Sequence, residues 1–179
     1  MKPNFALNFS HDTISLLHRT ARGWLEIGAT PIDAPDLGEA LSYLRRSALG
    51  LAPHGVTTKL IIPDDQILYL ELPAPGPTDV HRDAQIRAAL EGRTPYAVED
   101  LVFDWAGEGP VVQVAVIARE TLQEAESFAQ QYRFNPVSFV GLPDPASFDG
   151  EPWFGPSEAA AQLLPEGEFV ERDSAPVVI

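Results

Sequence analysis

Adjacent carboxylates are the first candidates for chemistry in this chain. Asp64 and Asp65 follow one another, and a carboxylate pair can hold a divalent cation or transfer protons. However, Pro63 precedes the pair and apolar alternation flanks it on both sides. That pattern is more typical of a tight turn between two strands, so we interpret the pair as a turn.

A second acidic group lies further along the chain. Glu99, Asp100 and Asp104 could hold a divalent ion together with Asp12, and a metal-dependent nuclease needs several carboxylates that converge on one sheet edge. The first predicted strand carries Asn8 where such an enzyme needs an aspartate. We therefore expect no nuclease activity.

Nucleophilic and zinc chemistry is not predicted either. Ser10, His11 and Asp12 have the residue types of a catalytic triad, but a triad is assembled from separate elements, and three consecutive residues cannot form the relay. The histidines lack the helical spacing of a zinc site; they are His11, His18, His54 and His81. The chain has no cysteine, which excludes a thiol nucleophile and a disulfide framework. We predict a non-catalytic protein without a metal site.

The charge of the chain narrows the class of partner. Its 26 acidic and 12 basic residues give a net charge of -14. Such a surface repels phosphate backbones and anionic lipid headgroups, so we expect no nucleic-acid binding and no direct membrane insertion. A protein partner with a Lys- or Arg-bearing segment fits better. No apolar run is long enough for a signal peptide core or a membrane span, and we expect a cytoplasmic protein.

Hydrophobic periodicity predicts an alternation of strands and helices. Strands are predicted over residues 5–9, 13–18, 23–28, 57–62, 67–72, 101–105, 111–118 and 137–140. Helices are predicted over residues 36–51, 78–91 and 119–132. Because short strands and helices mix without a strict strand–helix–strand repeat, we predict an α/β fold with a mixed sheet.

Composition divides the chain near residue 148. Residues 1–148 read as one domain, in which residues 63–110 form a small inserted lobe. Residues 149–179 are rich in acidic residues and proline, and predict a peripheral helix followed by an acidic tail or linker.

Several stretches, in the same order, resemble the first half of PilM-type pilus-assembly proteins and the cytoplasmic part of GspL-type secretion proteins. They are residues 6–15 (ALNFSHDTIS), 62–66 (IPDDQ), 94–105 (TPYAVEDLVFDW), 114–118 (VAVIA), 119–132 and 134–137 (FNPV). Together they span residues 4–143, and the stretch 94–105 is the most specific. The resemblance implies an actin-like, ribonuclease H-like half-fold.

The resemblance also implies where a nucleotide would bind. The family's opening hairpin carries an aspartate, a glycine and small hydroxyl residues, and it serves Mg·ATP. Here the hairpin contains Asn8, Ser10, His11 and Asp12. Asparagine brings no charge to a magnesium ion, and serine places a side chain where the backbone must approach a phosphate. We expect no cofactor, with ATP and magnesium at this hairpin as the alternative.

By resemblance, the chain is predicted to be a scaffold or interaction module that binds a basic segment of a membrane or assembly protein. Candidate partner-binding residues are the Pro95–Tyr96 corner and the aromatic pair Trp153 and Phe154, which either packs back on the domain or stays exposed. Two alternatives stay open. The chain is the first half of an actin-like ATPase, or it is a regulatory domain of a larger protein. The sequence predicts no particular partner or oligomeric state.

Overall fold

The computed structural model describes residues 1–179, which form two β-sheets and four α-helices. The strands are β1 (Phe5–Phe9), β2 (Thr13–Thr20), β3 (Gly23–Pro31), β4 (Thr58–Ile62), β5 (Leu68–Pro73), β6 (Leu101–Ala106), β7 (Val111–Ala118), β8 (Pro136–Gly141) and β9 (Trp153–Pro156). The helices are α1 (Leu37–Leu51), α2 (Asp79–Leu90), α3 (Arg119–Gln131) and α4 (Ala160–Leu163), with single 3₁₀ turns η1 (Asp64–Gln66) and η2 (Val98–Asp100). None of the helices is long and apolar enough to cross a lipid bilayer.

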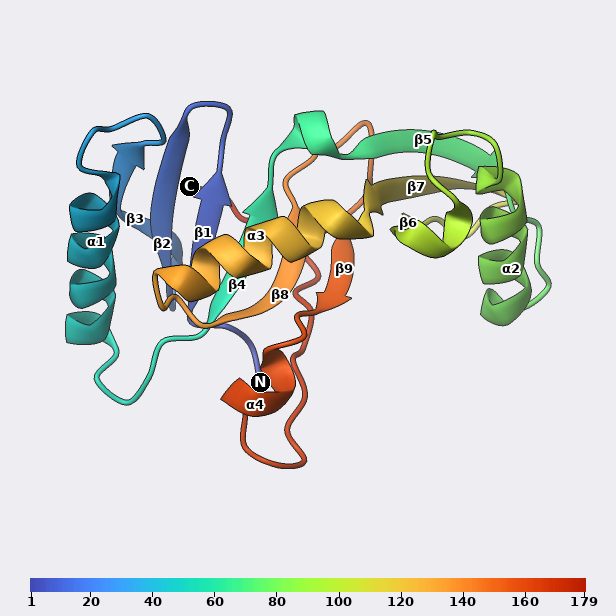
Figure 1. The fold of residues 1–179 in the computed structure, drawn as a ribbon. Helices are drawn as coiled ribbons and strands as arrows, with labels where there is room; N and C mark the ends of the chain where they lie inside the picture. Colours follow the sequence, from blue (N-terminus) through green and yellow to red (C-terminus); the bar gives the residue numbers. More distant parts are fainter.

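The larger sheet is six-stranded and mixed, in the order β3-β2-β1-β4-β8-β9 (Figure 1). Strands β1, β4 and β8 are parallel, whereas β2, β3 and β9 are added in antiparallel fashion. Strand β4 is buried along its whole length, as expected for a central strand of a sheet covered on both faces. The predicted α/β class with a mixed sheet is confirmed.

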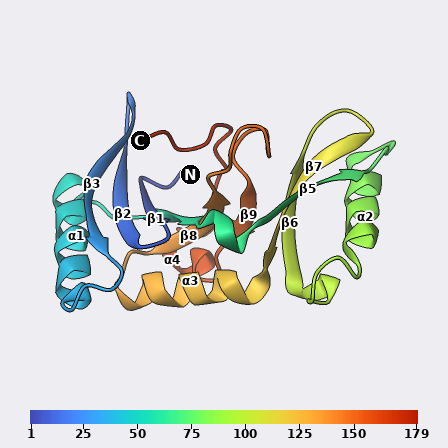
Figure 2. The ribbon, with the colours of Figure 1, turned by 90° about the horizontal axis from the view of Figure 1, so that it is seen from above.

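The smaller sheet has three antiparallel strands in the order β5-β7-β6. Helix α2 covers one face, and its buried side chains Ile86 and Leu90 join the apolar residues of the strands in a separate core. We call β5, β6, β7 and α2 the small lobe. It lies at the end of the larger sheet beyond β9, with α2 on its outer side (Figures 1 and 2).

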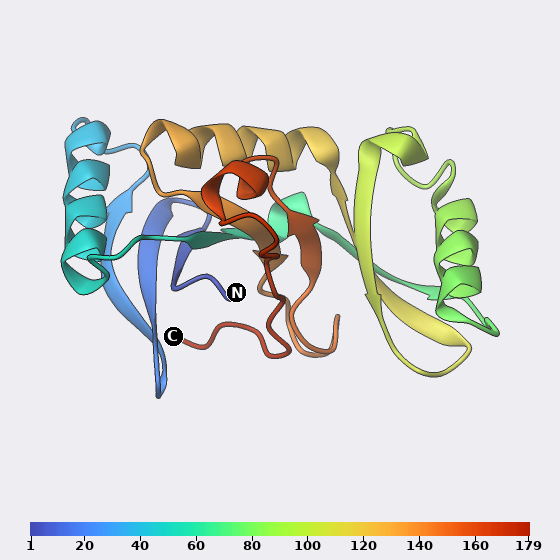
Figure 3. The same ribbon diagram turned by 90° about the horizontal axis from the view of Figure 1, so that it is seen from below.

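Helices α1 and α3 cover one face of the larger sheet, and the main core of 19 buried residues lies beneath them. The other face is covered by residues 165–179, which we call the C-terminal strap. Figures 2 and 3 show the strands between α3 on one side and the strap on the other. Val177 of the strap is buried against Ala6, Leu17, Ile61 and Val140 of the sheet. The strap is therefore part of the packed structure.

Helix α3 connects the two sheets without a loop. Ala118 ends β7 and is also the N-cap residue of α3. From there the helix runs across the larger sheet, where Phe128 packs edge-on against Phe9 with ring centroids 5.7 Å apart. The small lobe and the far end of β1 are thus linked by one continuous helix (Figure 1).

Gly141, at the end of β8, marks a close contact between the sheets. A Cβ atom there would lie 2.8 Å from the Tyr69 hydroxyl, 3.1 Å from Ile67 and 3.3 Å from Pro152. Because overpacking a filled site destabilises by about 1–3 kcal/mol, Gly141→Ala should lower the free energy of unfolding by that amount in urea titrations. Gly50→Ala is the matched control, since Gly50 lies in α1 and a Cβ there meets no atom within 4 Å. Equal stability of the two variants would contradict the prediction.

Candidate functional site

A groove of about 370 Å³ lies between the two sheets. We call it the inter-sheet groove. Its lining residues are Asp83 and Arg87 of α2, Leu101, Val102 and Phe103 of β6, Arg119, Leu122, Gln123 and Glu126 of α3, Phe139 of β8, and Phe154, Gly155, Pro156 and Glu158 of β9 and the following turn. The groove is therefore built from elements of both the small lobe and the larger sheet.

Two strand edges face the groove. Strand β6 is an edge of the smaller sheet and β9 is an edge of the larger sheet, and residues of both strands line the hollow. An edge strand presents main-chain N–H and C=O groups without a strand partner. The arrangement can therefore accept an extended polypeptide by main-chain pairing.

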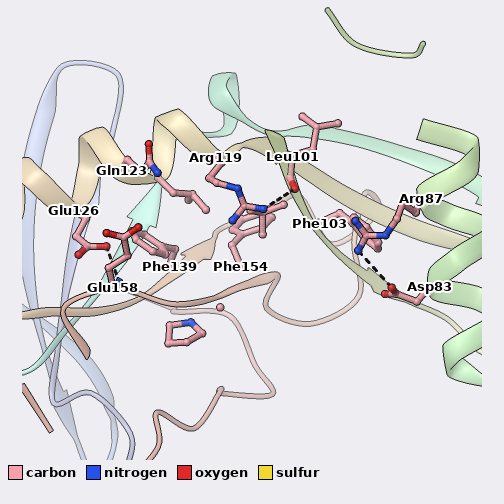
Figure 4. A pocket seen from close by; sticks show the side chains of 14 residues that line it. Asp83, Arg87, Leu101, Phe103, Arg119, Gln123, Glu126, Phe139, Phe154 and Glu158 are labelled. Carbon is pink, nitrogen blue, oxygen red and sulfur yellow. Dashed lines mark hydrogen bonds and ion pairs between the residues drawn. The ribbon is translucent and has the colours of Figure 1, made fainter. Parts of the chain in front are cut away.

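Charged side chains surround an apolar floor in the groove (Figure 4). The floor is formed by the buried side chains of Leu101, Leu122, Phe139 and Phe154. Three carboxylates and two guanidinium groups lie around it, from Asp83, Glu126, Glu158, Arg87 and Arg119. Such a mixed lining suits a peptide with both charged and apolar side chains better than it suits a small apolar ligand.

Most of these charges have internal partners. The Glu126 carboxylate accepts the backbone N–H groups of Glu158 and Ala159 at 3.0 and 3.1 Å. Arg119 donates to the carbonyl of Leu101 at 3.4 Å, and Arg87 lies 3.7 Å from Asp83. The Leu101 carbonyl therefore already points toward the groove, where it accepts a side-chain donor.

The predicted phosphate hairpin lines a different hollow, of about 360 Å³, beyond the carboxyl ends of β1 and β4. Asn8, Ser10 and His11 line it together with Asp64 and Asp65. Asp12 is not part of the lining; its carboxylate accepts the hydroxyl of its neighbour Thr13.

The hairpin hollow does not fit a magnesium nucleotide. The backbone N–H and the hydroxyl of Ser10 both donate to the Thr13 carbonyl at 2.9 Å, so they are not directed at a phosphate. Asp64 and Asp65 add negative charge, and burial raises the pKa of Asp64, with Asp65 and Asp144 contributing. No three His, Asp or Glu side chains are grouped so that they could hold a metal ion.

The Pro95–Tyr96 corner lines a third hollow, of about 290 Å³, with Leu68 of β5 and Leu101 of β6. Tyr96 is exposed, and its hydroxyl donates to Glu120 at 2.8 Å. Pro95 and Tyr96 do not line the inter-sheet groove, although Leu101 lines both hollows. The role of the corner in partner binding stays a prediction.

The aromatic pair lies in β9, a strand that sequence periodicity does not predict. Phe154 is buried in the main core with Phe148 and lines the inter-sheet groove, whereas Trp153 is half-buried beside the strap. Of the two alternatives for the aromatic pair, Phe154 therefore packs back on the domain. The backbone N–H of Trp153 donates to the Asp104 carboxylate at 2.9 Å, which joins β9 to β6.

A buried ionic cluster, also not predicted from the sequence, lies between the larger sheet and the strap. Lys59 of β4 is 1% exposed, and its ammonium group donates to Glu151 at 2.7 and 3.0 Å and to Asp173 at 2.8 Å. Arg19 forms a two-pronged pair with Asp173 at 2.9 and 2.8 Å. Trp24 stacks under both cations. We call Arg19, Lys59, Glu151 and Asp173 the ionic cluster.

The pKa values of the two carboxyl groups in the cluster are shifted in opposite directions. Burial raises the pKa of Glu151 to about 7, although the Lys59 ammonium opposes the shift. Burial acts on Asp173 in the same sense, but hydrogen bonds from Arg19 and Lys59 outweigh it and hold the pKa of Asp173 well below its usual value. Asp173 is therefore the permanent anion that fixes the strap.

Comparisons place this architecture among solved structures. No protein-family model and no curated protein sequence matches the chain. The cytoplasmic domain of EpsL, an inner-membrane component of the type II secretion system of Vibrio cholerae, is similar with a TM-score of 0.58 and 15% identity, over 93% of this chain and 79% of that one. The PilM-PilN type IV pilus biogenesis complex is similar with a TM-score of 0.52 and 19% identity, over 75% of this chain and 46% of that one.

Both similarities cover three quarters of this chain or more. At these identities they establish the fold alone. The chain has the PilM/GspL-like fold, an actin-like, ribonuclease H-like half-fold, as the resemblance in its sequence predicted.

Proposed function

We propose that this chain is a protein-interaction module that holds an extended segment of a partner protein in the inter-sheet groove. The observation that carries the proposal is the pair of edge strands, β6 and β9, which face one hollow from two different sheets. An added strand gains main-chain hydrogen bonds from an edge, and the neighbouring pockets select its side chains.

The similar structures support an interaction role. One is an inner-membrane component of a secretion system and the other is a complex of two pilus biogenesis proteins. By analogy with the first, we propose a cytoplasmic location next to a membrane assembly. The net charge of -14 favours a partner segment that carries Lys or Arg.

The proposal can be tested before the partner is identified. Peptides selected on the protein from a random display library should be enriched in Lys and Arg and in alternating apolar residues. Their binding should slow hydrogen exchange of backbone amides in β6 and β9. Protection confined to other elements, such as the Pro95–Tyr96 corner, would reject the inter-sheet groove as the site.

Two variants of α3 provide a matched pair for this test. Gln123 is exposed at the groove, whereas Gln130 is exposed on the same helix but does not line the groove. Gln123→Trp should fill the groove entrance and raise the Kd of a selected peptide at least about tenfold, or 1.4 kcal/mol. Gln130→Trp should leave the Kd unchanged, as measured by fluorescence anisotropy. Equal effects of the two variants would contradict the assignment.

A further inference from the structure

The structure contains a tie between the two sheets, formed by adjacent residues of the C-terminal strap. Asp173 is held on the larger sheet by Lys59 and Arg19. Its neighbour Arg172 reaches the small lobe, where its guanidinium group donates to the Asp104 carboxylate of β6 at 2.8 Å. One dipeptide therefore connects a central strand of one sheet to the edge strand of the other.

The tie lies at the far end of the groove from the chain crossings that join the lobe to the larger sheet. Those crossings are η1, between β4 and β5, and the junction of β7 with α3. Leu101 of β6 pairs with Ala118 at that junction, and Asp104 lies three residues further along β6, about 10 Å away. If the lobe rotates about these crossings, a residue far from them moves further than a residue close to them. The tie is therefore placed where it can restrain such a rotation most.

The hollow beside the tie continues the groove. A space of about 550 Å³ is lined by Asp83, which also lines the inter-sheet groove, and by Asp104, Trp105 and Arg172. Together the two hollows follow β6 along Leu101–Trp105. Arg172 thus occupies the end of the path that an extended segment along β6 would take.

The contacts at the tie differ in strength on its two sides. Asp173 meets two cations on the larger sheet, one of them fully buried. The Arg172 side chain is 48% exposed, and besides Asp104 it contacts the Glu151 carbonyl at 3.0 Å and the face of the Trp153 ring. Exposed ion pairs contribute little to stability. In addition, the indole N–H of Trp153 at this point is buried without a hydrogen-bond acceptor, which is unfavourable in the closed arrangement. The Arg172 side is therefore the weaker side of the tie.

We propose that this tie of Arg172 and Asp173, called the clasp from here on, sets the separation of the two sheets. We propose also that a partner segment along β6 displaces Arg172 from Asp104. The proposal rests on the proposed function for its partner, although the clasp itself does not. Asp173 stays on the larger sheet while Arg172 is released. Binding in the groove and closure of the clasp then oppose one another, and a basic side chain of the partner takes the place of Arg172 on Asp104.

Contacts other than the clasp also join the lobe to the larger sheet, and one of them is the bond from the Trp153 N–H to Asp104 described above. The Gln113 side chain of β7 accepts the backbone N–H of Asp149 at 2.8 Å and donates to the carbonyl of Ala146 at 3.3 Å. Both partners lie in the loop between β8 and β9 and outside the strap. This contact keeps the lobe attached when the clasp opens, so the expected motion is a limited change of angle.

The clasp can be tested with spin labels, because the chain has no native cysteine. Ala88 of α2 and Tyr43 of α1 are exposed and line neither the groove nor the hollow beside the tie, so Ala88→Cys and Tyr43→Cys place one label on each side of the groove. The distance distribution between the labels should broaden in Arg172→Met. It should stay as in the parent protein in Lys2→Met, which removes a cation 3.6 Å from Asp173 that does not bridge the sheets. Identical distributions in Arg172→Met and the parent would overturn the clasp, whether or not any peptide binds.

The coupling is tested separately with a display-selected peptide that protects β6. Arg172→Met should lower the Kd of that peptide at least about threefold, since binding no longer competes with the clasp. Lys2→Met should leave the Kd unchanged. A broadened distance distribution with an unchanged or raised Kd would overturn the coupling. A failure to select any groove-binding peptide would count against the proposed function while the spin-label result still decides the clasp.

Discussion

Replacing Lys59 by methionine is expected to lower the free energy of unfolding by about 3–5 kcal/mol. The ammonium group is the common partner of Glu151 and Asp173, and the side chains of Lys59 and Glu151 are 2% and 1% exposed. Removal of the cation leaves the Glu151 carboxylate buried without a charged partner. Such an uncompensated charge destabilises a protein far more than the pair stabilises it. Urea unfolding at pH 8, followed by tryptophan fluorescence, measures the loss.

The double variant Lys59→Met with Glu151→Gln is the control for this prediction. It removes both charges of the buried pair, and replacing a buried pair by uncharged groups is often close to neutral. The double variant should therefore recover most of the stability lost in Lys59→Met. A loss below about 1 kcal/mol in the single variant, or a double variant as unstable as the single one, would show that the cluster does not act as a buried pair.

The pH dependence of stability should also reveal the cluster. The pKa of Glu151 is raised from 4.5 to about 7 in the folded protein, so the folded state binds this proton more tightly than the unfolded state does. The resulting stabilisation is complete below pH 4.5 and is lost as the pH rises through 7. Its upper limit is about 3 kcal/mol, because one pKa unit corresponds to about 1.4 kcal/mol.

Glu151→Gln removes this titration, so the difference between the parent protein and the variant isolates it. The parent should lose stability relative to Glu151→Gln between pH 5 and pH 8 in urea titrations. Asp173 has the opposite dependence: its lowered pKa stabilises the fold above the ordinary value of 3.8 and this contribution is lost only in stronger acid. It therefore does not interfere in the measured range. Parallel stability curves for the two proteins would contradict the raised pKa.

Sequence periodicity predicts most of the elements because their apolar faces are regular. Residues 111–118 form an almost continuous apolar run and fold as β7, and the apolar stripe of residues 36–51 forms α1. The strand β9 is different, since it is four residues long and contains Gly155 and Pro156. So short a run has no measurable alternation, and only its pairing with β8 identifies it as a strand.

The ionic cluster could not be predicted as a cluster because its members are distant in sequence. Lys59 is 92 residues from Glu151 and 114 residues from Asp173. One local signal does exist: Lys59 interrupts a strand that is otherwise apolar or β-branched, Thr58–Ile62. A lysine in a strand buried on both faces requires an anionic partner, although the sequence does not reveal which of the 26 acidic residues supplies it.

One wall of the inter-sheet groove is a strand that the sequence predicts, and the other wall is a strand that it does not predict. The stretch 94–105, which carries the most specific resemblance, contains the corner before β6 and all of the strand except Ala106. The other wall is β9, together with Glu158 and the α3 residues that face it. A groove between two sheets depends on how the sheets are placed, and that placement is set by tertiary contacts such as those of Gly141 and Asp104.

The direct junction of β7 with α3 has a mechanical consequence. A 13-residue helix is about 20 Å long. Because no loop separates α3 from β7, a rotation of the small lobe would also move α3. A partner that pulls on β6 would therefore pull, through β7, on the N-terminal end of α3. The displacement would emerge where Phe128 touches Phe9, beside the hairpin after β1. Mechanical load on the groove would thus be transmitted across β8 and β4 to β1 in the larger sheet.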